Sequence, residues 1–456
     1  MVLLKRRENL GGMKVEFTPL YHALLREKER GRVSFHTPGH KSNAPFLREL
    51  FSMDTTELPD TDSLYEASSV ILEAEKKAAA LYGAQKALFS AGGSTLCIQT
   101  MLRLAMPAGG KMIVGRTIHR SAVNAMALLN IEPIWVYPRK DAGEGVPGRV
   151  HPDDILMAYQ KHPNAKAVYL TSPDYYGVLS DVEEIAEKLH PFAIPLLVDA
   201  AHGAHLRFLS CKFDPIACGA SMAAYSLHKT LPALTPAAWL MIGDGRFVSA
   251  SKEAMALFGS TSPSYPVMAS IDLCRNWLEE RGKNAFFDLT EATEQIKKTA
   301  SEKGIVFPVG NCDPTRLCFT TAAIGVGGKE AAEHFRECGI EPEYCDDNNL
   351  VLIPTPFNRQ EDFDRLQRAI KTLPRRDQSD IWRPKEPKVN RVLSLREAVL
   401  APCELVCTEK SVGRIAAEAA CPCPPGVPIL MPGEKITKTA VSFLLNYGIF
   451  TIKVVK

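Results

Sequence analysis

The central part of the chain alternates between short apolar runs and amphipathic stretches. The apolar runs predict strands at residues 86–91, 111–115, 133–138, 165–173, 194–200, 222–227 and 237–243. Between several of these strands, apolar residues at helical spacing predict helices at 96–106, 121–130, 153–162 and 181–190. Strands that are apolar along their whole length and separated by helices indicate a largely parallel sheet with both faces covered. We therefore predict an α/β domain built on a mostly parallel, seven-stranded sheet.

Smaller units are predicted before and after this central domain. Residues 18–31 and 68–84 predict helices that stop at a glycine. After the large domain, long helices lead into a strand, a helix, a second strand at 343–356 and a last helix, while prolines preclude a regular helix at 421–434. The predicted segments are an N-terminal arm (1–67), a large domain (68–275), a small α/β domain (276–376), a linker rich in proline and charge (377–390) and a C-terminal domain (391–456).

The charge balance excludes an obvious electrostatic partner. The net charge is +2, from 54 basic and 52 acidic side chains, so nothing in it indicates nucleic acid or an anionic membrane as partner. No apolar stretch is long enough to cross a membrane, and the apolar run at the N-terminus is too short for a secretion signal. We therefore expect a cytoplasmic protein.

The cysteines do not predict a metal site. The chain has 12 cysteines, which we expect to be reduced thiols in a cytoplasmic protein. The tightest group is Cys403, Cys407, Cys421 and Cys423, whose spacings are C-x3-C and C-x-C instead of paired C-x2-C. Because free cysteines commonly behave as small apolar residues, that interpretation is favoured over zinc, and we predict no metal.

Functional sites in parallel sheets form beyond the carboxyl ends of the strands, so polar residues at the predicted strand ends are the candidates for site residues. The first predicted strand is followed by Gly92 to Thr95 and a helix. This arrangement suits a phosphate as well as it suits an ordinary capped turn. His119 follows the second predicted strand, where a lone histidine is more often structural than catalytic.

Two further strand ends carry charge. Asp199 ends a strongly apolar strand, where a carboxylate requires a cationic partner. His202 and His205 follow it, but no further ligand completes a metal set. Lys229 ends another strand, and taken alone it is better explained as an exposed or snorkelling lysine than as a nucleophile. Together, however, an anion cradle, a histidine ring, a buried acid and a strand-end lysine are the parts that hold pyridoxal 5′-phosphate.

Motifs along nearly the whole chain carry a family resemblance. They are FHTPGHK, TELPDTDSL, GGSTLCIQ, SPDYYGVLSD, VDAAHGAH, SLHKTLPALT, STSPSYPVMASID and PPGVPILMPGE. The chain resembles the ornithine/lysine/arginine decarboxylase family of fold-type I pyridoxal-phosphate enzymes, and its length is similar to that of the shorter bacterial members. The resemblance implies decarboxylation of a basic amino acid, with arginine first and then lysine or ornithine, to an amine used in polyamine biosynthesis. It also implies a homodimer or higher homo-oligomer with the site at the subunit interface.

The resemblance implies a role for each matching residue. It implies that residues 68–275 form the domain that binds pyridoxal phosphate. Lys229 would form the Schiff base with the cofactor, Asp199 would pair with its pyridine nitrogen, and His119 would stack on its ring. The remaining implied roles are phosphate binding by Gly93, Ser94, Thr95 and Ser226, a place near the ring oxygen for His202, a place near the reacting carbon for His228, and service to the neighbouring subunit's cofactor by Ser260 and Thr261.

Departures from the family pattern keep two alternatives open. Ala200 replaces an acid, Asp174 replaces a threonine and Pro236 replaces a glutamine. The alternatives are another fold-type I enzyme, such as an aminotransferase or a lyase, and a catalytically silent regulatory paralogue. The acidic group for the distal cation of the substrate is not identified by the sequence. Glu404 and Glu434 are candidates by position only, and the favoured interpretation of both is an exposed surface glutamate.

Overall fold

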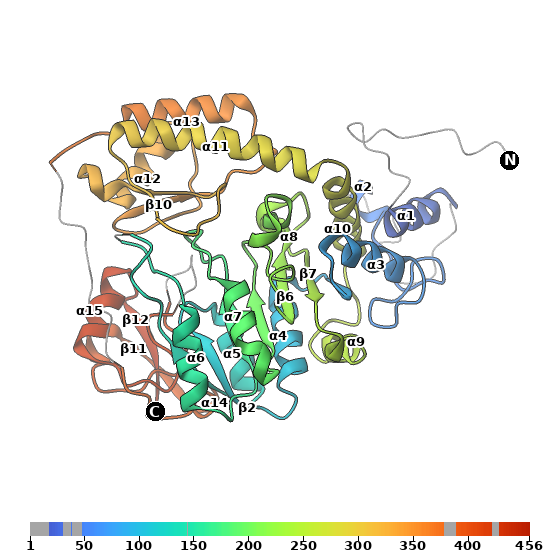
Figure 1. Cartoon of the computed structure of the whole chain (residues 1–456), viewed down its shortest axis with the longest axis horizontal. Helices are drawn as coiled ribbons and strands as arrows, with labels where there is room; N and C mark the ends of the chain where they lie inside the picture. The colour runs from blue at the N-terminus through green and yellow to red at the C-terminus, as the bar shows by residue number, and fades with distance from the viewer. Residues whose placement is uncertain (1–17, 31–37, 39–47, 144, 378–388, 422–427) are drawn as a thin grey trace. The chain divides into compact units, whose positions relative to one another are not determined.

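The computed structural model (Figure 1) describes residues 18–30, 38, 48–143, 145–377, 389–421 and 428–456. Contacts divide the chain into two compact units. The first unit consists of residues 1–104 and 198–286, and the second of residues 105–197 and 287–456. Within the described ranges, no helix combines the length and apolar character that a membrane crossing requires. The domain limits expected from the sequence stay predictions.

The main sheet has the seven predicted strands, in the order β1-β7-β6-β5-β4-β2-β3. They are β1 (Lys86–Ser90), β2 (Gly110–Gly115), β3 (Ile131–Val136), β4 (Val168–Thr171), β5 (Leu196–Asp199), β6 (Met222–Ser226) and β7 (Ala238–Ile242). Strand β2 pairs in parallel with β3 and β4, whereas β7 runs antiparallel to both β6 and β1. The mixed α/β class and the mostly parallel sheet are therefore confirmed.

In the first unit, helices surround an aromatic core. Tyr82 lies edge-on to Tyr225 of β6 and Trp239 of β7, with ring centroids 5.2 and 5.1 Å away. Tyr82 ends α3, and Gly83 closes that helix in the left-handed conformation (φ 70°), as the sequence predicted. The helices are α1 (Pro19–Arg30), α2 (Arg48–Phe51), α3 (Val70–Tyr82), α4 (Gly93–Ala105), α8 (Leu227–Thr230), α9 (Ser251–Ala256) and α10 (Tyr265–Trp277).

The long helices that the sequence predicted after the large domain follow one another without a loop. A π-helical segment (Leu278–Gly282) joins α10 to α11 (Lys283–Lys303). Gly282 lies where an added Cβ would come 2.9 Å from a ring carbon of Phe208. A larger residue there would have to displace the aromatic side chain.

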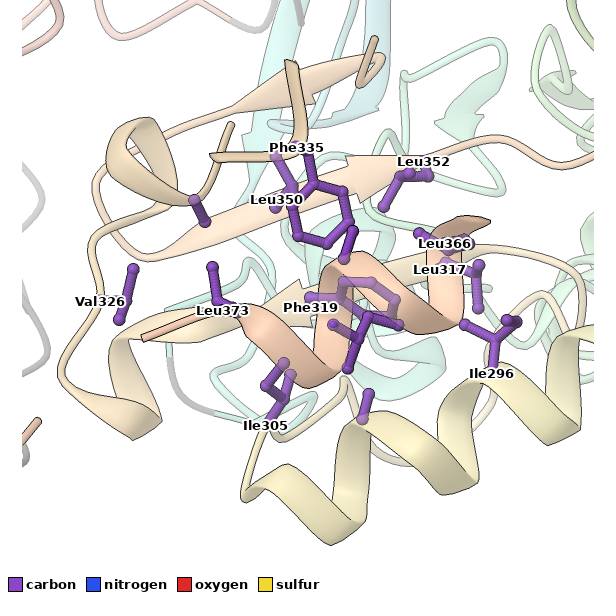
Figure 2. Close-up of a cluster of buried hydrophobic side chains, with 14 of the residues drawn as sticks. Ile296, Ile305, Leu317, Phe319, Val326, Phe335, Leu350, Leu352, Leu366 and Leu373 are labelled. Carbon is purple, nitrogen blue, oxygen red and sulfur yellow. The ribbon is translucent and has the colours of Figure 1, made fainter. Parts of the chain in front are cut away.

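The second unit contains a small α/β layer with its own apolar core. Its antiparallel sheet has the order β8-β10-β9, and α12 (Gly328–Glu337) and α13 (Gln360–Thr372) pack with it. The strands are β8 (Leu317–Thr320), β9 (Tyr344–Cys345) and β10 (Asn349–Leu352). Figure 2 shows Ile296, Phe319 and Leu366 among the side chains gathered between these helices and strands.

The single strand predicted at 343–356 is wrong, because the chain turns back within it. The Oδ1 atom of Asp346 accepts hydrogen bonds from the backbone N–H groups of Asn348 and Asn349. These bonds fix the turn that separates β9 from β10. The adjacent polar residues 346–349 were the sequence signal for this turn.

The rest of the second unit includes α5 (Arg120–Leu128), α6 (Pro152–Lys161) and α7 (Val182–Leu189) and the C-terminal elements α14 (Leu395–Leu400), β11 (Cys403–Cys407), α15 (Lys438–Asn446) and β12 (Thr451–Val455). Strands β11 and β12 pair antiparallel. Cys403 and Cys407 are both exposed on β11, while Cys423 and most of the predicted linker lie outside the described residues. Residues 428–434 are not helical, as their prolines predicted. The described residues contain no cluster suited to a metal ion.

Candidate active site

The lysine singled out by the sequence lies on a single helical turn. Strand β6 ends at Ser226, and α8 follows at once and carries His228 and Lys229. The Nζ atom of Lys229 lies 2.9 Å from Nε2 of His202, in the loop after β5. The distance fits a hydrogen bond that the lysine donates to an unprotonated Nε2. The structure thus brings together two of the predicted site residues and directs the amine.

Asp199 ends strand β5 in the interior of the first unit. The residue is only 2% exposed, and its Oδ1 accepts a hydrogen bond from the N–H of Ala201. The next residue, Ala200, is fully buried, and its N–H donates to the carbonyl of Ala224 on β6. An acid at position 200 would place a second carboxylate at a buried position next to Asp199, which is unfavourable, so the alanine fits its surroundings.

His228 is held by its Nδ1 atom. This atom lies 3.2 Å from the carbonyl oxygen of Ala237 and 3.3 Å from Oγ of Ser226. Partial burial lowers the pKa of His228; the hydrogen bond to Ala237 opposes this effect and the charge of Lys229 adds to it. A neutral ring that donates its Nδ1 proton to Ala237 leaves Nε2 as the acceptor. Oγ of Ser226, expected on the phosphate, lies beside this ring, and its phosphate role stays a prediction.

The predicted phosphate cradle is a tight turn between β1 and α4. The Oγ atom of Ser90 donates to the carbonyl of Gly93 at 2.9 Å and accepts from the N–H of Gly92 at 3.2 Å. A Cβ atom on Gly92 would come within 3.0 Å of the Leu96 side chain, and Gly93 has φ 70°. Ser94 is half-buried and Thr95 is exposed. The turn therefore requires glycine and leaves backbone N–H groups at a helix start, which suit an anion.

Two residues of this region were missed by sequence reasoning. Ser90 holds the turn, and its signal was a serine at the last position of a buried strand, separated from two glycines by one alanine. Pro236, a departure from the family pattern that the sequence did not explain, packs against the cradle. A Cβ atom on Gly93 would lie 3.5 Å from Cβ of Pro236. The following residue, Ala237, accepts the hydrogen bond of His228. Residues 236 and 237 therefore connect the cradle to the histidine.

Three other predicted residues are described by their own local contacts. His119 belongs to the second unit, where it precedes α5 and its Nδ1 accepts the N–H of Ser121 at 3.2 Å. This contact caps the helix and fixes the direction of a half-buried ring. Ser260 and Thr261 are exposed in the segment before α10. The roles expected for His119, Ser260 and Thr261 stay predictions.

The two glutamates proposed by position differ in the structure. Glu404 has an exposed side chain and pairs with Arg414 at 2.6 Å, in agreement with a surface residue. Glu434 is not a surface residue: it is 2% exposed, and its Oε2 accepts from Nη2 of Arg116 at 3.0 Å. The surface interpretation of Glu434 is therefore wrong, because the sequence did not show which cation it meets.

Asp174, where the family pattern has threonine, is also buried. Its Oδ1 accepts the N–H groups of Tyr176 and Val178 at 2.9 and 2.8 Å, a task that a threonine hydroxyl can share. Its Oδ2 is buried without a hydrogen-bond partner among the described residues. Burial raises the pKa of Asp174 to about 7, against the lowering effect of these hydrogen bonds and of the Arg316 charge.

Comparisons with known proteins match most of the chain to amino-acid decarboxylases. Residues 18–313 match the family model described as Orn/Lys/Arg decarboxylase, major domain, and residues 379–452 match its C-terminal domain. The chain is 30% identical to an arginine decarboxylase of Bacillus subtilis, over 94% of this chain and 93% of the relative. It is 22% identical to the constitutive lysine decarboxylase of Escherichia coli, over 94% of this chain and 77% of the relative.

Solved structures show the same fold. The constitutive lysine decarboxylase of Escherichia coli superposes with a TM-score of 0.77 at 20% identity, covering 96% of this chain and 82% of that one. Lysine decarboxylase A from Pseudomonas aeruginosa gives a TM-score of 0.80 at 17% identity, covering 96% and 80%. A NifS-like protein is more distant, with a TM-score of 0.54 at 14% identity over 77% of this chain. The fold is that of fold-type I pyridoxal-phosphate enzymes.

Proposed function

This chain belongs to the Orn/Lys/Arg decarboxylase family and decarboxylates a basic amino acid, and we propose that its substrate is arginine and its cofactor pyridoxal 5′-phosphate. The observation that carries the cofactor proposal is the hydrogen bond between Lys229 and His202, and the burial of Asp199 at the end of β5 supports it. Lysine and ornithine are the next substrate candidates. Relatives named arginine decarboxylase at 30% identity over 94% of the chain support arginine first.

The residues present fit the cofactor. Asp199 is buried at the end of β5, and a carboxylate in that place would favour the protonated form of a pyridine nitrogen beside it. The glycine turn before α4 would hold a phosphate, because the first N–H groups of a helix have no partner within the helix and favour an anion. Lys229 is the amine that would bind the aldehyde. When bound, pyridoxal phosphate supplies the electron sink for the pair left by the departing carboxylate.

The protein residues would direct the reaction through fixed contacts. Asp199 would hold a proton on the pyridine nitrogen of the bound cofactor. His202 accepts from Nζ of Lys229 and so directs the amine. His228 has a lowered pKa, caused first by burial, and is therefore mainly neutral at neutral pH. A neutral imidazole cannot donate a proton easily, so we assign the return of the proton to Cα to Nζ of Lys229, with Nε2 of His228 as an acceptor beside it.

The assembly and cellular role are proposed from the family. A homo-oligomer would place Ser260 and Thr261, both exposed here, near a neighbouring subunit's cofactor. A cytoplasmic enzyme that makes an amine from arginine would supply polyamine biosynthesis. These statements rest on the family resemblance.

A covalent-trapping experiment tests the cofactor and its lysine together. The purified chain is loaded with pyridoxal phosphate and reduced with borohydride, and its peptides are analysed by mass spectrometry. We expect the pyridoxyl group on Lys229 alone and a lost visible absorption band in Lys229→Ala. A label spread over several lysines, or an unchanged band in Lys229→Ala, contradicts the assignment.

A further inference from the structure

The short connection between β2 and α5 carries two residues of interest. The N–H of Arg116 donates to the carbonyl of Val136 and so extends the pairing of β2 with β3 by one residue. His119 follows and caps α5 through its Nδ1 atom. Between them, Ile118 is fully buried. Arg116 and His119 therefore lie in one short connection, anchored by the strand pairing at one end and by the helix cap at the other.

Arg116 is held by two aromatic faces, one carboxylate and the carbonyl of Ile429, to which its Nη2 donates at 3.4 Å. The residue is 8% exposed, and its guanidinium lies 5.0 Å from the ring centre of Trp135 and 5.8 Å from that of Tyr137. Its Nη2 donates to Oε2 of Glu434 at 3.0 Å. Its Nη1 is buried with no hydrogen-bond partner among the described residues. Glu434 is thus the carboxylate paired with this charge, and a buried guanidinium that lost it would be poorly compensated.

Glu434 lies in a rigid turn of the C-terminal segment. Its Oε2 also accepts the N–H of Met431 at 2.7 Å, and its own N–H donates to the carbonyl of Met431. Gly433 has φ 86°, and a Cβ atom there would come 2.3 Å from the carbonyl oxygen of Leu393. The turn at residues 431–434 thus presents the carboxylate in one direction. These residues end the PPGVPILMPGE motif, for which the sequence offered no role beyond a position-based candidate.

We propose that Glu434 and Arg116 are positioning residues for decarboxylation, which fix the loop carrying His119, and that Glu434 does not receive the distal cation of the substrate. The inference rests on the proposed function and on the role that the family resemblance implies for His119, which is to stack on the cofactor ring. Oε2 of Glu434 already accepts from both Arg116 and Met431, so a substrate guanidinium would have to displace a buried ion pair. If the substrate guanidinium paired with Glu434, the buried guanidinium of Arg116 would lose its carboxylate, so no ion pair would be gained overall.

Two variants separate positioning from substrate binding. Glu434→Gln and Arg116→Gln should each lower kcat by about 10- to 100-fold, because a small misplacement near the reacting atoms has effects of this size. The KM for arginine should change by less than about threefold in both, since neither residue is expected to touch the substrate. The double variant should be no worse than the worse single variant, because both act through one contact. Glu404→Gln, an exposed glutamate of the same C-terminal segment, is the matched control.

A measurement that needs no activity tests the same contact. Hydrogen–deuterium exchange is recorded on the full chain without added cofactor. Glu434→Gln should raise exchange in peptides covering residues 116–122 and leave peptides of β6 and β7 unchanged, whereas Glu404→Gln should leave both unchanged. If Glu434→Gln does not fold, Glu434→Asp keeps the charge with a shorter reach and should show the same local increase, to a smaller extent.

The outcomes distinguish this proposal from the proposed function. A rise in the KM for arginine of about tenfold or more in Glu434→Gln, with Arg116→Gln near wild type, would show that Glu434 binds the substrate and would overturn the proposal. Unchanged exchange at residues 116–122 in both Glu434 variants would also overturn it. A wild-type chain that releases no carbon dioxide from any basic amino acid would contradict the proposed function and leave the exchange result as the test of the contact.

Discussion

The amine of Lys229 lies 2.9 Å from Nε2 of His202, although 27 positions separate the two residues in the chain. The lysine comes from the turn after β6 and the histidine from the loop after β5. The contact holds the amine of a long side chain in one direction. Pre-orientation of a reacting group is a large source of rate enhancement in enzymes.

We expect His202→Phe to lower kcat by about 10- to 100-fold, because the phenyl ring keeps the volume of the imidazole and removes the acceptor for Lys229. His202→Gln should lose less, since its amide oxygen can still accept. His205 serves as the control: it lies in the same loop but packs against Phe286 at 5.4 Å. Steady-state kinetics with a thermal melt for each variant checks this. An equal loss of activity in His205→Phe and His202→Phe would mean that packing of the loop, and not the hydrogen bond, matters.

His228 should control the acid side of the pH profile. Its pKa is lowered, first by burial, so the folded enzyme keeps the neutral ring down to a pH below the ordinary histidine value. As the pH falls through this lowered pKa, the ring gains a proton, and kcat/KM should fall with it. His228→Gln should remove this inflection and lower the plateau. A wild-type inflection above the ordinary histidine pKa would contradict the predicted direction.

Asp174 should make the stability of the protein depend on pH. Its folded pKa of about 7 lies above the value of an unfolded aspartate. The stabilisation from the neutral acid is therefore complete below the unfolded pKa and is lost as the pH rises through the folded pKa. The loss approaches about 1.4 kcal/mol per pH unit between these two values. Urea unfolding across this range should show the fall in the wild-type chain.

The matched variants for Asp174 are asparagine and threonine. Both keep a side-chain oxygen for the N–H groups of Tyr176 and Val178 and cannot ionise. Relative to wild type, either variant should gain stability as the pH rises from about 5 to about 8. Parallel stability curves for wild type and Asp174→Asn would show that this carboxyl is already ionised throughout the range.

Gly93 offers a test of the phosphate cradle with an internal control. Gly93 and Gly83 both have φ 70°, so an alanine at either position carries a similar backbone strain of about 1–2 kcal/mol. Only at Gly93 does the added Cβ enter the turn beside Pro236. We expect both variants to be destabilised and only Gly93→Ala to bind pyridoxal phosphate about tenfold or more weakly. Equal cofactor affinity in the two variants, from fluorescence titration, would remove Gly93 from the phosphate site.

The main sheet could be predicted because its strands are short apolar runs, several of them separated by amphipathic helices. The same signal located Asp199 and Lys229, since Asp199 is the last residue of β5 and Lys229 lies in the helical turn directly after β6. The sequence could not show contacts between distant segments. Pro236 against Gly93 and Glu434 against Arg116 join residues far apart in the chain, and each residue taken alone suits a surface loop. The missed turn at Asp346 was local, but apolar residues on both sides favoured one strand.

The central claim is that this chain removes the carboxylate of arginine with Lys229 as the cofactor-binding amine. Its most direct test is the release of labelled carbon dioxide from carboxyl-labelled arginine, lysine and ornithine by the chain loaded with pyridoxal phosphate, with Lys229→Ala beside it. We predict release from arginine at the highest kcat/KM, together with an equal amount of the corresponding amine, and loss of this release in Lys229→Ala. No release from any of the three amino acids, or release that persists in Lys229→Ala, would contradict the claim.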